Sequence, residues 1–365
     1  MNAHSYDIGI VGAGPAGATL ARLLADRCRV LLLDSGRPKC CGGILAPEAQ
    51  NMLARLGLAL PKSVLADPQP FAVTILDADN ECSRKYARQY VNIDRLAFDQ
   101  WALSLLPSSV DLRREAVYRF SERCDNELAV HFTERNSERT ERVRRLVGAD
   151  GANSAVRREF FSQHPVPQRY LAVQDWFESN AVHIESTVDF RNSYVGVFDR
   201  EFTDFYCWTI PKNGSLIVGG AFPAGPDIRL RFERFKKKLE RYGLFLGERT
   251  RREADRIFRP VSLSSICLGN DRVFLAGEAA GLISPSSAEG ISTALAGAVA
   301  LSEALDDNNA AKKYRRRLRG LIWNIIRKSM KSPVMFSPGL RRWIMKSGLL
   351  SLTASASDAI GTEKR

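Results

Sequence analysis

The opening of the chain constrains its fold more than any other stretch. A short apolar run is followed by the spacing Gly12-x-Gly14-x-x-Gly17, then by leucines at helical spacing, and then by a second apolar run that ends at Asp34. This order predicts a strand, a glycine turn, a helix and a second strand. A glycine-rich turn in an ordinary α/β unit is the alternative. Because strand, helix, second strand and terminal acid are all in register, we predict a dinucleotide-binding unit.

Each residue of this pattern has a physical role in such a unit. Gly12 permits a tight turn, Gly14 lets a pyrophosphate approach the backbone, and Gly17 lets the helix pack closely on the strand. The start of the helix then faces the phosphate and stabilises its charge. Asp34 lies about 20 residues further on, where a carboxylate can accept a hydrogen bond from a ribose hydroxyl.

Length and composition limit the class of protein. The chain of 365 residues is long enough for two domains, and its hydrophobic fraction of 45% is normal for a globular protein. The seven cysteines are odd in number and scattered, which suits a reducing compartment better than a disulfide framework. We expect no metal site, because there is no Cys-x-x-Cys pair and there are only four histidines.

The sequence gives no sign of targeting to or through a membrane. The uncharged run at residues 8–21 is preceded by Asp7 and by no basic region, so we expect no signal peptide. No stretch approaches the roughly 20 apolar residues that a membrane-spanning helix needs. We expect a cytoplasmic protein, and a peripheral position on the inner face of the membrane is left open.

The formal net charge of +12 is concentrated near the C-terminus. Residues 311–350 hold twelve basic residues, as many as the whole excess of 53 basic over 41 acidic residues, and residues 308–357 include no acid. One apolar helical stripe can form here, from Leu318, Leu321, Ile322, Ile325 and Ile326. A helix packed on the body with a solvated basic side, or an anionic membrane surface as partner, explains this pattern. We expect no nucleic-acid partner.

Two further glycine motifs follow apolar runs later in the chain. They are Asp150-Gly151 and Gly277-Glu278. An acid at a strand end can approach a bound nucleotide, and we expect a helix to begin near Ala288, where its start can stabilise negative charge. Taken singly, an ordinary Asp-Gly turn and an ordinary strand-to-helix joint explain these motifs equally well.

The middle of the chain has a different pattern. From residue 170 to residue 222, short apolar runs alternate with polar interruptions, which predicts an antiparallel sheet inserted into the nucleotide domain. Strand alternation puts Tyr206, Trp208 and Ile210 on one face of this sheet. That face is either plain core or the wall of a substrate site.

The three glycine motifs, in this order, resemble the superfamily of FAD-dependent monooxygenases and reductases with the p-hydroxybenzoate hydroxylase-like fold. The resemblance implies an α/β protein: a Rossmann-like FAD-binding domain with an inserted antiparallel β-sheet substrate domain and a C-terminal helical segment. It also implies FAD, although Glu278 takes a position where most of the superfamily has Asp. The residues it implies around FAD are Gly12, Gly14, Pro15, Ala16 and Gly17 at the pyrophosphate, Asp34 at the ribose, Arg95, Asp150 and Gly277, Glu278 at the ribityl chain, and Pro285, Gly290 and Ile291 at the flavin ring.

We expect Arg95 to lie at the start of a helix capped by Asn92 or Asp94.

The same resemblance suggests domain limits. The expected ranges are 1–65, 88–165 and 258–310 for the FAD-binding domain, 66–87 and 166–257 for the substrate domain, and 311–365 for the basic C-terminal helical segment.

Two other motifs are similar to those of the geranylgeranyl reductase family. They are Lys39-Cys40-Cys41-Gly42-Gly43 and Tyr206-x-Trp208-x-Ile210-Pro211, in which Ile210 replaces the reductase Phe. This resemblance implies hydride transfer from reduced flavin to a carbon-carbon double bond of an isoprenoid or another apolar small molecule or lipid. It implies Cys41, Tyr206 and Trp208 as catalytic residues. Structural packing of Cys41 is the alternative.

Two other functions fit the same residues. The Tyr-x-Trp-x-Ile-Pro motif differs by one residue from the Trp-x-Trp-x-Ile-Pro element of flavin-dependent halogenases, so an FAD-dependent monooxygenase or halogenase is the first alternative. The second is a non-catalytic flavin-bearing peripheral membrane protein that acts through its basic segment. The sequence has no second Gly-x-Gly-x-x-Gly, so NADPH, a separate flavin reductase and ferredoxin all stay open as the electron donor.

Overall fold

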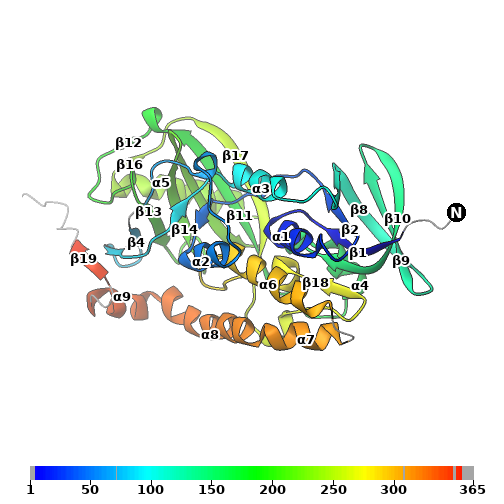
Figure 1. Cartoon of the computed structure of the whole chain (residues 1–365). Coiled ribbons are helices and arrows are strands. Elements are labelled where there is room, and N and C mark those ends of the chain that lie inside the picture. The colour runs from blue at the N-terminus through cyan, green and yellow to red at the C-terminus, as the bar shows by residue number, and fades with distance from the viewer. Residues whose placement is uncertain (1–4, 71, 307–308, 348–350, 356–365) are drawn as a thin grey trace, which may run out of the picture.

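The structure is a computed structural model that describes residues 5–70, 72–306, 309–347 and 351–355. Two β-sheets lie side by side, and three helices form a row along one side of the molecule (Figure 1). The ends of the predicted domain ranges at 1–4, 307–308, 348–350 and 356–365 lie outside the described residues.

The first sheet has seven strands and a parallel centre. The order β7-β2-β1-β10-β9-β8 is joined by β18, which pairs with β10. Strands β1, β2, β7, β10 and β18 are mutually parallel, whereas β9 is antiparallel to both β10 and β8. The bounds are β1 (Tyr6–Val11), β2 (Val30–Asp34), β7 (Asp111–Arg114), β8 (Ala116–Cys124), β9 (Glu127–Glu134), β10 (Ser137–Gly148) and β18 (Val273–Leu275).

Helices cover this sheet because their apolar faces bury against it. Leu20 and Leu24 on α1, with Ala298 and Leu301 on α6, join the core that contains Ile10 on β1. The helices of this region are α1 (Pro15–Leu24), α2 (Pro47–Arg55), α3 (Arg95–Ser104), α4 (Ala155–Phe160) and α6 (Ile291–Ala304). The predicted strand, glycine turn, helix and strand at the start of the chain are therefore confirmed.

The start of α3 distinguishes the two predicted caps. The carboxylate of Asp94 accepts a hydrogen bond from the backbone N–H of Ala97 at 2.9 Å, so Asp94 is the cap. Asn92 lies in a strand instead, where its side chain donates to the carbonyls of Pro68 and Pro211.

The second sheet has eight strands, in the order β17-β11-β15-β14-β13-β4-β5-β19. It is antiparallel, as predicted, except that β13 and β4 run parallel. The two segments are far apart in the sequence, so no hairpin forces them to run in opposite directions. The bounds are β4 (Val73–Asp77), β5 (Cys82–Tyr86), β11 (Gln168–Glu178), β13 (Tyr194–Phe198), β14 (Cys207–Lys212), β15 (Ser215–Pro223), β17 (Arg249–Arg259) and β19 (Ser351–Ser355).

The two faces of this sheet bury different residues. Helix α5 (Ile228–Leu239) covers one face, where Phe232, Phe235 and Leu239 pack against Val218 and its neighbours. The side chains of Tyr206, Trp208 and Ile210 lie together in the cluster on the other face, as strand alternation predicts. The chain limits of the two predicted domains stay a prediction.

The C-terminal segment is mostly helical. It contains α7 (Ala310–Arg317), α8 (Arg319–Phe336) and α9 (Pro338–Ser347), which follow one another in a row (Figure 1). The predicted helical segment is wrong at residues 351–355, where β19 pairs with β5 and so extends the second sheet. Within the described residues, no helix is both long and apolar enough to cross a membrane.

Short elements connect these parts. Two small sheets pair β3 (Ile44–Leu45) with β6 (Val91–Asn92), and β12 (His183–Ile184) with β16 (Leu244–Phe245). Single 3₁₀ turns are η1 (Lys62–Val64), η2 (Gly151–Asn153), η3 (Ser179–Ala181), η4 (Glu240–Tyr242), η5 (Leu263–Ser265) and η6 (Gly277–Ala280).

Candidate functional site

The loop from Gly12 to Gly17, here called the nucleotide loop, joins β1 to α1. Gly12 has φ of 99°, and a Cβ there would lie 2.5 Å from the carbonyl oxygen of Ala149. A Cβ on Gly17 would overlap the carbonyl oxygen of Gly12. By contrast, a Cβ on Gly14 would have no atom within 4 Å. Gly14 precedes Pro15, the first residue of α1, so the open space lies at a helix N-terminus, which favours a phosphate.

The acid at the end of β2 lies where the sequence predicts it. Asp34 is the last residue of the strand, and its Oδ1 accepts a hydrogen bond from the backbone N–H of Gly36 at 3.0 Å. This contact fixes the carboxylate at the strand end, the position from which such an acid reaches a ribose.

The second motif adjoins the nucleotide loop, since Gly12 packs against Ala149 and Asp150. Asp150 Oδ2 accepts a hydrogen bond from the backbone N–H of Ala155 at 2.7 Å. Its Oδ1 is buried without a hydrogen-bond partner among the described residues, and burial raises the pKa of this carboxyl. A buried oxygen without a partner is costly, so a donor on a bound ligand would stabilise it.

The third motif adjoins the first. A Cβ on Gly277 would lie 3.0 Å from Cβ of Ala16. The neighbouring Glu278 accepts a hydrogen bond from Lys39 Nζ at 2.9 Å and another from the backbone N–H of Phe258 at 2.9 Å. Burial lowers the pKa of Lys39, but the nearby carboxylates of Glu278 and Asp255 outweigh it and raise that pKa. The sequence predicts Glu278 but gives no sign of its cationic partner.

Residues 39–43, here called the cysteine loop, pack directly on the strand that carries the aromatic motif. A Cβ on Gly42 would overlap Cδ1 of Ile210 on β14. Gly43 has φ of 65°, and a Cβ there would overlap the carbonyl oxygen of Ile93. The two motifs that resemble reductase motifs are far apart in the sequence and therefore meet only in the folded chain.

The two thiols of the cysteine loop have different surroundings. Cys40 is buried, and burial raises its pKa, so its thiol stays protonated. Cys41 is half-buried, its Sγ accepts a hydrogen bond from the backbone N–H of Gly43 at 3.4 Å, and it lies near Arg95. Arg95 Nε in turn lies 3.0 Å from each carboxylate oxygen of Asp99. Of the two thiols, Cys41 is therefore the more accessible one, and it lies near a cation that Asp99 holds.

Trp208 is on β14, and Tyr206 directly precedes that strand. Each of the two side chains is 8% exposed. The Tyr206 hydroxyl donates to the carbonyl oxygen of Ser287 at 2.7 Å, and burial raises its pKa well above the usual value, so it acts as a donor. The Trp208 ring lies against Gly219, where a Cβ would come within 2.5 Å of it. Its Nε1 is buried without a partner among the described residues.

The loop that Tyr206 touches runs from Ser284 to Gly290. The helix predicted to begin near Ala288 begins at Ile291, with Gly290 as its cap. It cannot include Ala288, whose φ of 52° a right-handed helix does not allow. Such a φ on a residue with a side chain is strained and is often found at functional sites. The neighbouring Pro285 accepts a hydrogen bond from Arg259 Nε at 3.2 Å.

An acid in this loop has partners that sequence reasoning missed. Glu289 Oε1 accepts a hydrogen bond from the Tyr90 hydroxyl at 2.6 Å, and Arg88 lies 3.3 Å from its Oε2. Tyr90 stacks edge-on against Tyr194, with 5.6 Å between the ring centroids. Since these residues come from three separate segments, no local pattern in the sequence links them.

Lys212 is a second residue that the sequence did not single out. It is 3% exposed, and its Nζ donates to the carbonyl oxygens of Gly43, at 3.3 Å, and Ile93. Burial lowers the pKa of Lys212 to about 8. The sequence does contain a sign of this residue, because Lys212 directly follows Pro211 of the aromatic motif.

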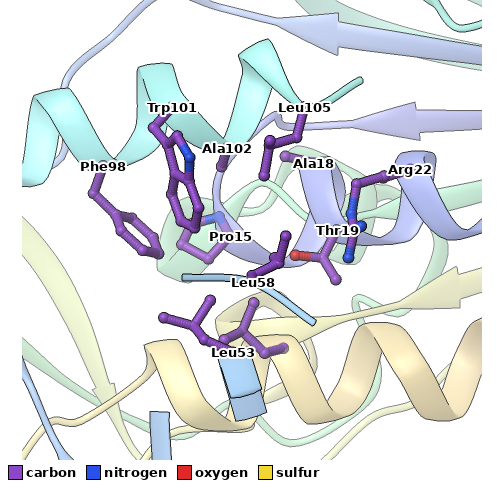
Figure 2. Close-up of a pocket in the computed structure, with 11 residues that line it drawn as sticks. Pro15, Ala18, Thr19, Arg22, Leu53, Leu58, Phe98, Trp101, Ala102 and Leu105 are labelled. Carbon is purple, nitrogen blue, oxygen red and sulfur yellow. The ribbon is translucent and has the colours of Figure 1, made fainter. Parts of the chain in front are cut away.

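A small pocket lies among α1, α2, α3 and α6. Figure 2 shows the rings of Phe98 and Trp101, on α3, pointing toward Pro15, with Leu53 and Leu58 below them. Its volume of about 10 Å³ is room for about one water molecule, and the described residues that line it include none of the three glycines. This pocket is too small for a flavin.

Comparison with known proteins identifies relatives along nearly the whole chain. Residues 5–190 match the family model described as FAD binding domain. Protein CbrA of Escherichia coli O9:H4 (strain HS) is 41% identical over 355 residues, which covers 94% of each chain.

Solved structures show the same fold at low identity. A geranylgeranyl bacteriochlorophyll reductase-like protein from Thermoplasma acidophilum has a TM-score of 0.78 at 18% identity, covering 98% of this chain and 94% of its own. PqsL of Pseudomonas aeruginosa, a probable FAD-dependent monooxygenase, has a TM-score of 0.68 at 17% identity, covering 94% of this chain and 100% of its own.

Proposed function

We propose an activity for this chain from the premise that it belongs to the FAD binding domain family and is a relative of the CbrA proteins. It is an FAD-dependent oxidoreductase by that membership. We propose that its reaction is the reduction of a carbon-carbon double bond in an isoprenoid or another apolar substrate.

One observation carries this proposal: the cysteine loop packs on β14, the strand that carries Trp208 and Ile210 and directly follows Tyr206. Gly42 lies against Ile210, and Gly43 lies against the backbone of Ile93. Two motifs that resemble reductase motifs thus form one site, next to the loop at 284–290 that Tyr206 contacts. A resemblance of sequence alone would not require the two motifs to meet.

The residues present fit FAD. The open space at Gly14 before α1 suits the pyrophosphate, and Asp34 suits the ribose. The unpartnered Oδ1 of Asp150 could accept a hydrogen bond from a donor group of FAD. When bound and reduced, FAD supplies the hydride. The further assignments of Pro15, Ala16, Arg95, Glu278, Pro285, Gly290 and Ile291 to FAD are part of this proposal.

The protein must supply the other hydrogen. Reduction of a double bond adds a hydride to one carbon and a proton to the other. Cys41 is the proposed proton donor, because it is the half-buried thiol of the cysteine loop, and that loop packs on the strand that carries the aromatic motif. Tyr206, which keeps its proton, and Trp208 would form the wall that orients the apolar substrate. NADPH, a separate flavin reductase or ferredoxin would return the electrons.

An anaerobic absorption spectrum tests the proposal. The purified holoprotein is chemically reduced and then mixed with a polyprenyl lipid in the absence of oxygen. We expect the bands of oxidised flavin to return, with a reduced lipid as product. Flavin bands that return only in air, together with an oxygenated or halogenated product, would instead support the alternative that rests on the Tyr-x-Trp-x-Ile-Pro motif. No reoxidation by any acceptor would favour the non-catalytic alternative.

Cysteine variants test the proton donor separately. Cys41→Ala should keep its flavin and lose about 10²-fold or more of the lipid-dependent reoxidation rate, the typical contribution of a positioned acid. Cys124→Ala removes a half-buried thiol from β8, outside the loop, and should change neither. Unchanged turnover in Cys41→Ala with full flavin content would remove Cys41 from the mechanism and leave it a packing role.

A further inference from the structure

The apolar stripe of α8 is used inside the molecule. Leu318 and Ile325 are each 2% exposed and Ile322 is 8% exposed, and all three belong to the core of the nucleotide domain. Leu321 and Ile326 pack against the same core. This stripe therefore packs on the body of the protein, which is one of the two explanations that the sequence leaves open.

The opposite side of α8 carries a second set of apolar residues. A helix turns about 100° per residue, so Trp323, Arg327 and Met330 point away from the side that holds Ile325. Trp323 is 64% exposed and Met330 is 72% exposed. Large apolar side chains on an outward helix face need a reason, because exposed apolar patches often mark interaction sites.

Helix α9 repeats this arrangement. Arg341 and Met345 are buried against the body, and Arg341 forms ion pairs with Asp77 at 2.7 Å and Asp79 at 2.5 Å. These contacts fix the rotation of the helix about its axis. Trp343 is 73% exposed and lies on the side opposite to the anchoring residues.

The outward face extends over two helices. Helix α8 alone has 18 residues, or about 27 Å, and α9 continues the row along the same side of the molecule (Figure 1). A long row of exposed side chains fits a broad partner surface better than a folded protein with a pocket.

The charge of this face indicates the chemistry of the partner surface. Basic side chains lie between the apolar ones: Arg319 and Arg327 are exposed on α8, and Arg342 and Lys346 are exposed on α9. No acidic residue occurs in the sequence from 308 to 357. Tryptophan beside arginine and lysine is the composition of helices that lie in the interface of an anionic membrane.

We propose that the outward face of α8 and α9, here called the docking face, binds an anionic lipid surface. Its residues are Arg319, Trp323, Arg327, Met330, Leu340, Arg342, Trp343 and Lys346. The tryptophans enter the headgroup region while the basic residues contact the lipid phosphates. This proposal does not depend on the reaction that the flavin site performs.

Sedimentation of the full-length holoprotein with vesicles tests it. One set of vesicles contains equal parts of phosphatidylglycerol and phosphatidylcholine, and the other contains phosphatidylcholine alone. We expect binding to the anionic set only. Replacing both Arg327 and Arg342 by Ala removes two charges and should weaken this binding about 30-fold. Trp323→Ser with Trp343→Ser should weaken it by at least about tenfold.

A matched pair of variants on another surface is the control. Arg229→Ala with Leu230→Ser removes one exposed cation and one exposed apolar side chain from α5, and should leave vesicle binding unchanged. Circular dichroism and the flavin spectrum report whether each variant is folded. Brominated lipids, which quench nearby tryptophan, should quench the wild type and not the Trp323→Ser, Trp343→Ser variant.

Several outcomes would overturn the proposal. They are no sedimentation with either set of vesicles, equal sedimentation with both, or equal loss of binding in the α5 control. Self-association that the tryptophan variant abolishes, without vesicle binding, would make the docking face an interface between copies. Retention by an acidic protein or a nucleic acid, again without vesicle binding, would assign it to that class of partner.

Discussion

The nucleotide loop and the cysteine loop both depend on glycine, but different atoms occupy the place of the missing side chains. Beside Gly14 there is open space, at the start of a helix. Beside Gly42 and Gly43 there are the side chain of Ile210, the backbone of Ile93 and the ammonium of Lys212. Glycine therefore makes room for a ligand in the first loop and for the protein itself in the second.

This difference separates two kinds of requirement within one site. In the nucleotide loop, Gly17 meets the carbonyl oxygen of Gly12, so the loop also has a glycine that serves its own packing. In the cysteine loop both glycines serve packing, and the result is that Cys41 is held beside Arg95. A substitution beside open space should therefore cost FAD affinity, whereas a substitution beside protein atoms should cost stability.

The largest effect is expected for Gly17→Ala. The new Cβ would overlap the carbonyl oxygen of Gly12, so the nucleotide loop must shift. We expect a loss of about 3 kcal/mol or more in the free energy of unfolding, and FAD content below about a tenth of that of the wild type because the phosphate site is deformed. Thermal unfolding and flavin absorbance measure the two effects.

Gly320→Ala is the control for Gly17→Ala. A Cβ on Gly320 has no atom within 4 Å, and the residue lies in α8. This substitution should keep FAD content and raise stability by up to about 1 kcal/mol, since alanine favours a helix more than glycine. If Gly17→Ala behaved like Gly320→Ala, the close packing of the nucleotide loop would be wrong.

The next effect concerns Lys212 and depends on pH. Burial lowers the pKa of Lys212 to about 8 from 10.5, so its charged form is disfavoured in the folded state. Between these two pH values the unfolded chain binds the extra proton, and the stability of the wild type should rise with pH by about 3 kcal/mol from this residue. Lys212→Met should lack that rise. The measurement is the difference between the two unfolding curves across this window.

Other titrating groups cancel in that difference, and Lys62→Met on the surface is the control. It should follow the wild type at every pH. A constant difference between wild type and Lys212→Met from pH 8 to pH 10.5 would contradict the buried ammonium.

A smaller effect is expected for Gly43→Ala. The φ of 65° and the backbone of Ile93 both oppose a side chain, so we expect a loss of about 1–3 kcal/mol in the free energy of unfolding. Because the nucleotide loop is separate, FAD content should be retained. Maleimide should label Cys41 faster than in the wild type as the cysteine loop loosens. Loss of FAD equal to that in Gly17→Ala would remove the distinction between the loops.

The parts of the fold that could be predicted are those with local signals. The nucleotide loop shows as a change from strand to helix period at the glycines, and the start of α3 shows as two candidate polar caps, Asn92 and Asp94, before an apolar helix. Membership of the FAD-dependent superfamily rested on three motifs in order. Each of these patterns involves only a few neighbouring residues, so it can be recognised without knowledge of any tertiary contact.

The parts that could not be predicted depend on contacts between distant segments. Lys39 pairs with Glu278, and Glu289 binds Tyr90, across 239 and 199 positions of the sequence. The helix expected near Ala288 begins only at Ile291, because Ala288 takes a left-handed φ, which nothing in its own chemistry indicates. The apolar stripe of α8 was found correctly, but only the position of the body shows that it faces inward.

The smallest effect on stability, and the sharpest test of the comparison, is expected for Gly14→Ala. Since a Cβ there has no atom within 4 Å, and the backbone φ of −69° suits any residue, the free energy of unfolding of the FAD-free protein should change by less than about 0.5 kcal/mol. The same methyl group would occupy space that the pyrophosphate needs, so FAD affinity should fall by about tenfold or more. Equilibrium titration with FAD and unfolding of the FAD-free protein give the two numbers. Unchanged affinity would mean that the open space beside Gly14 does not hold the phosphate, and the nucleotide loop would then lose the feature that distinguishes it from the cysteine loop.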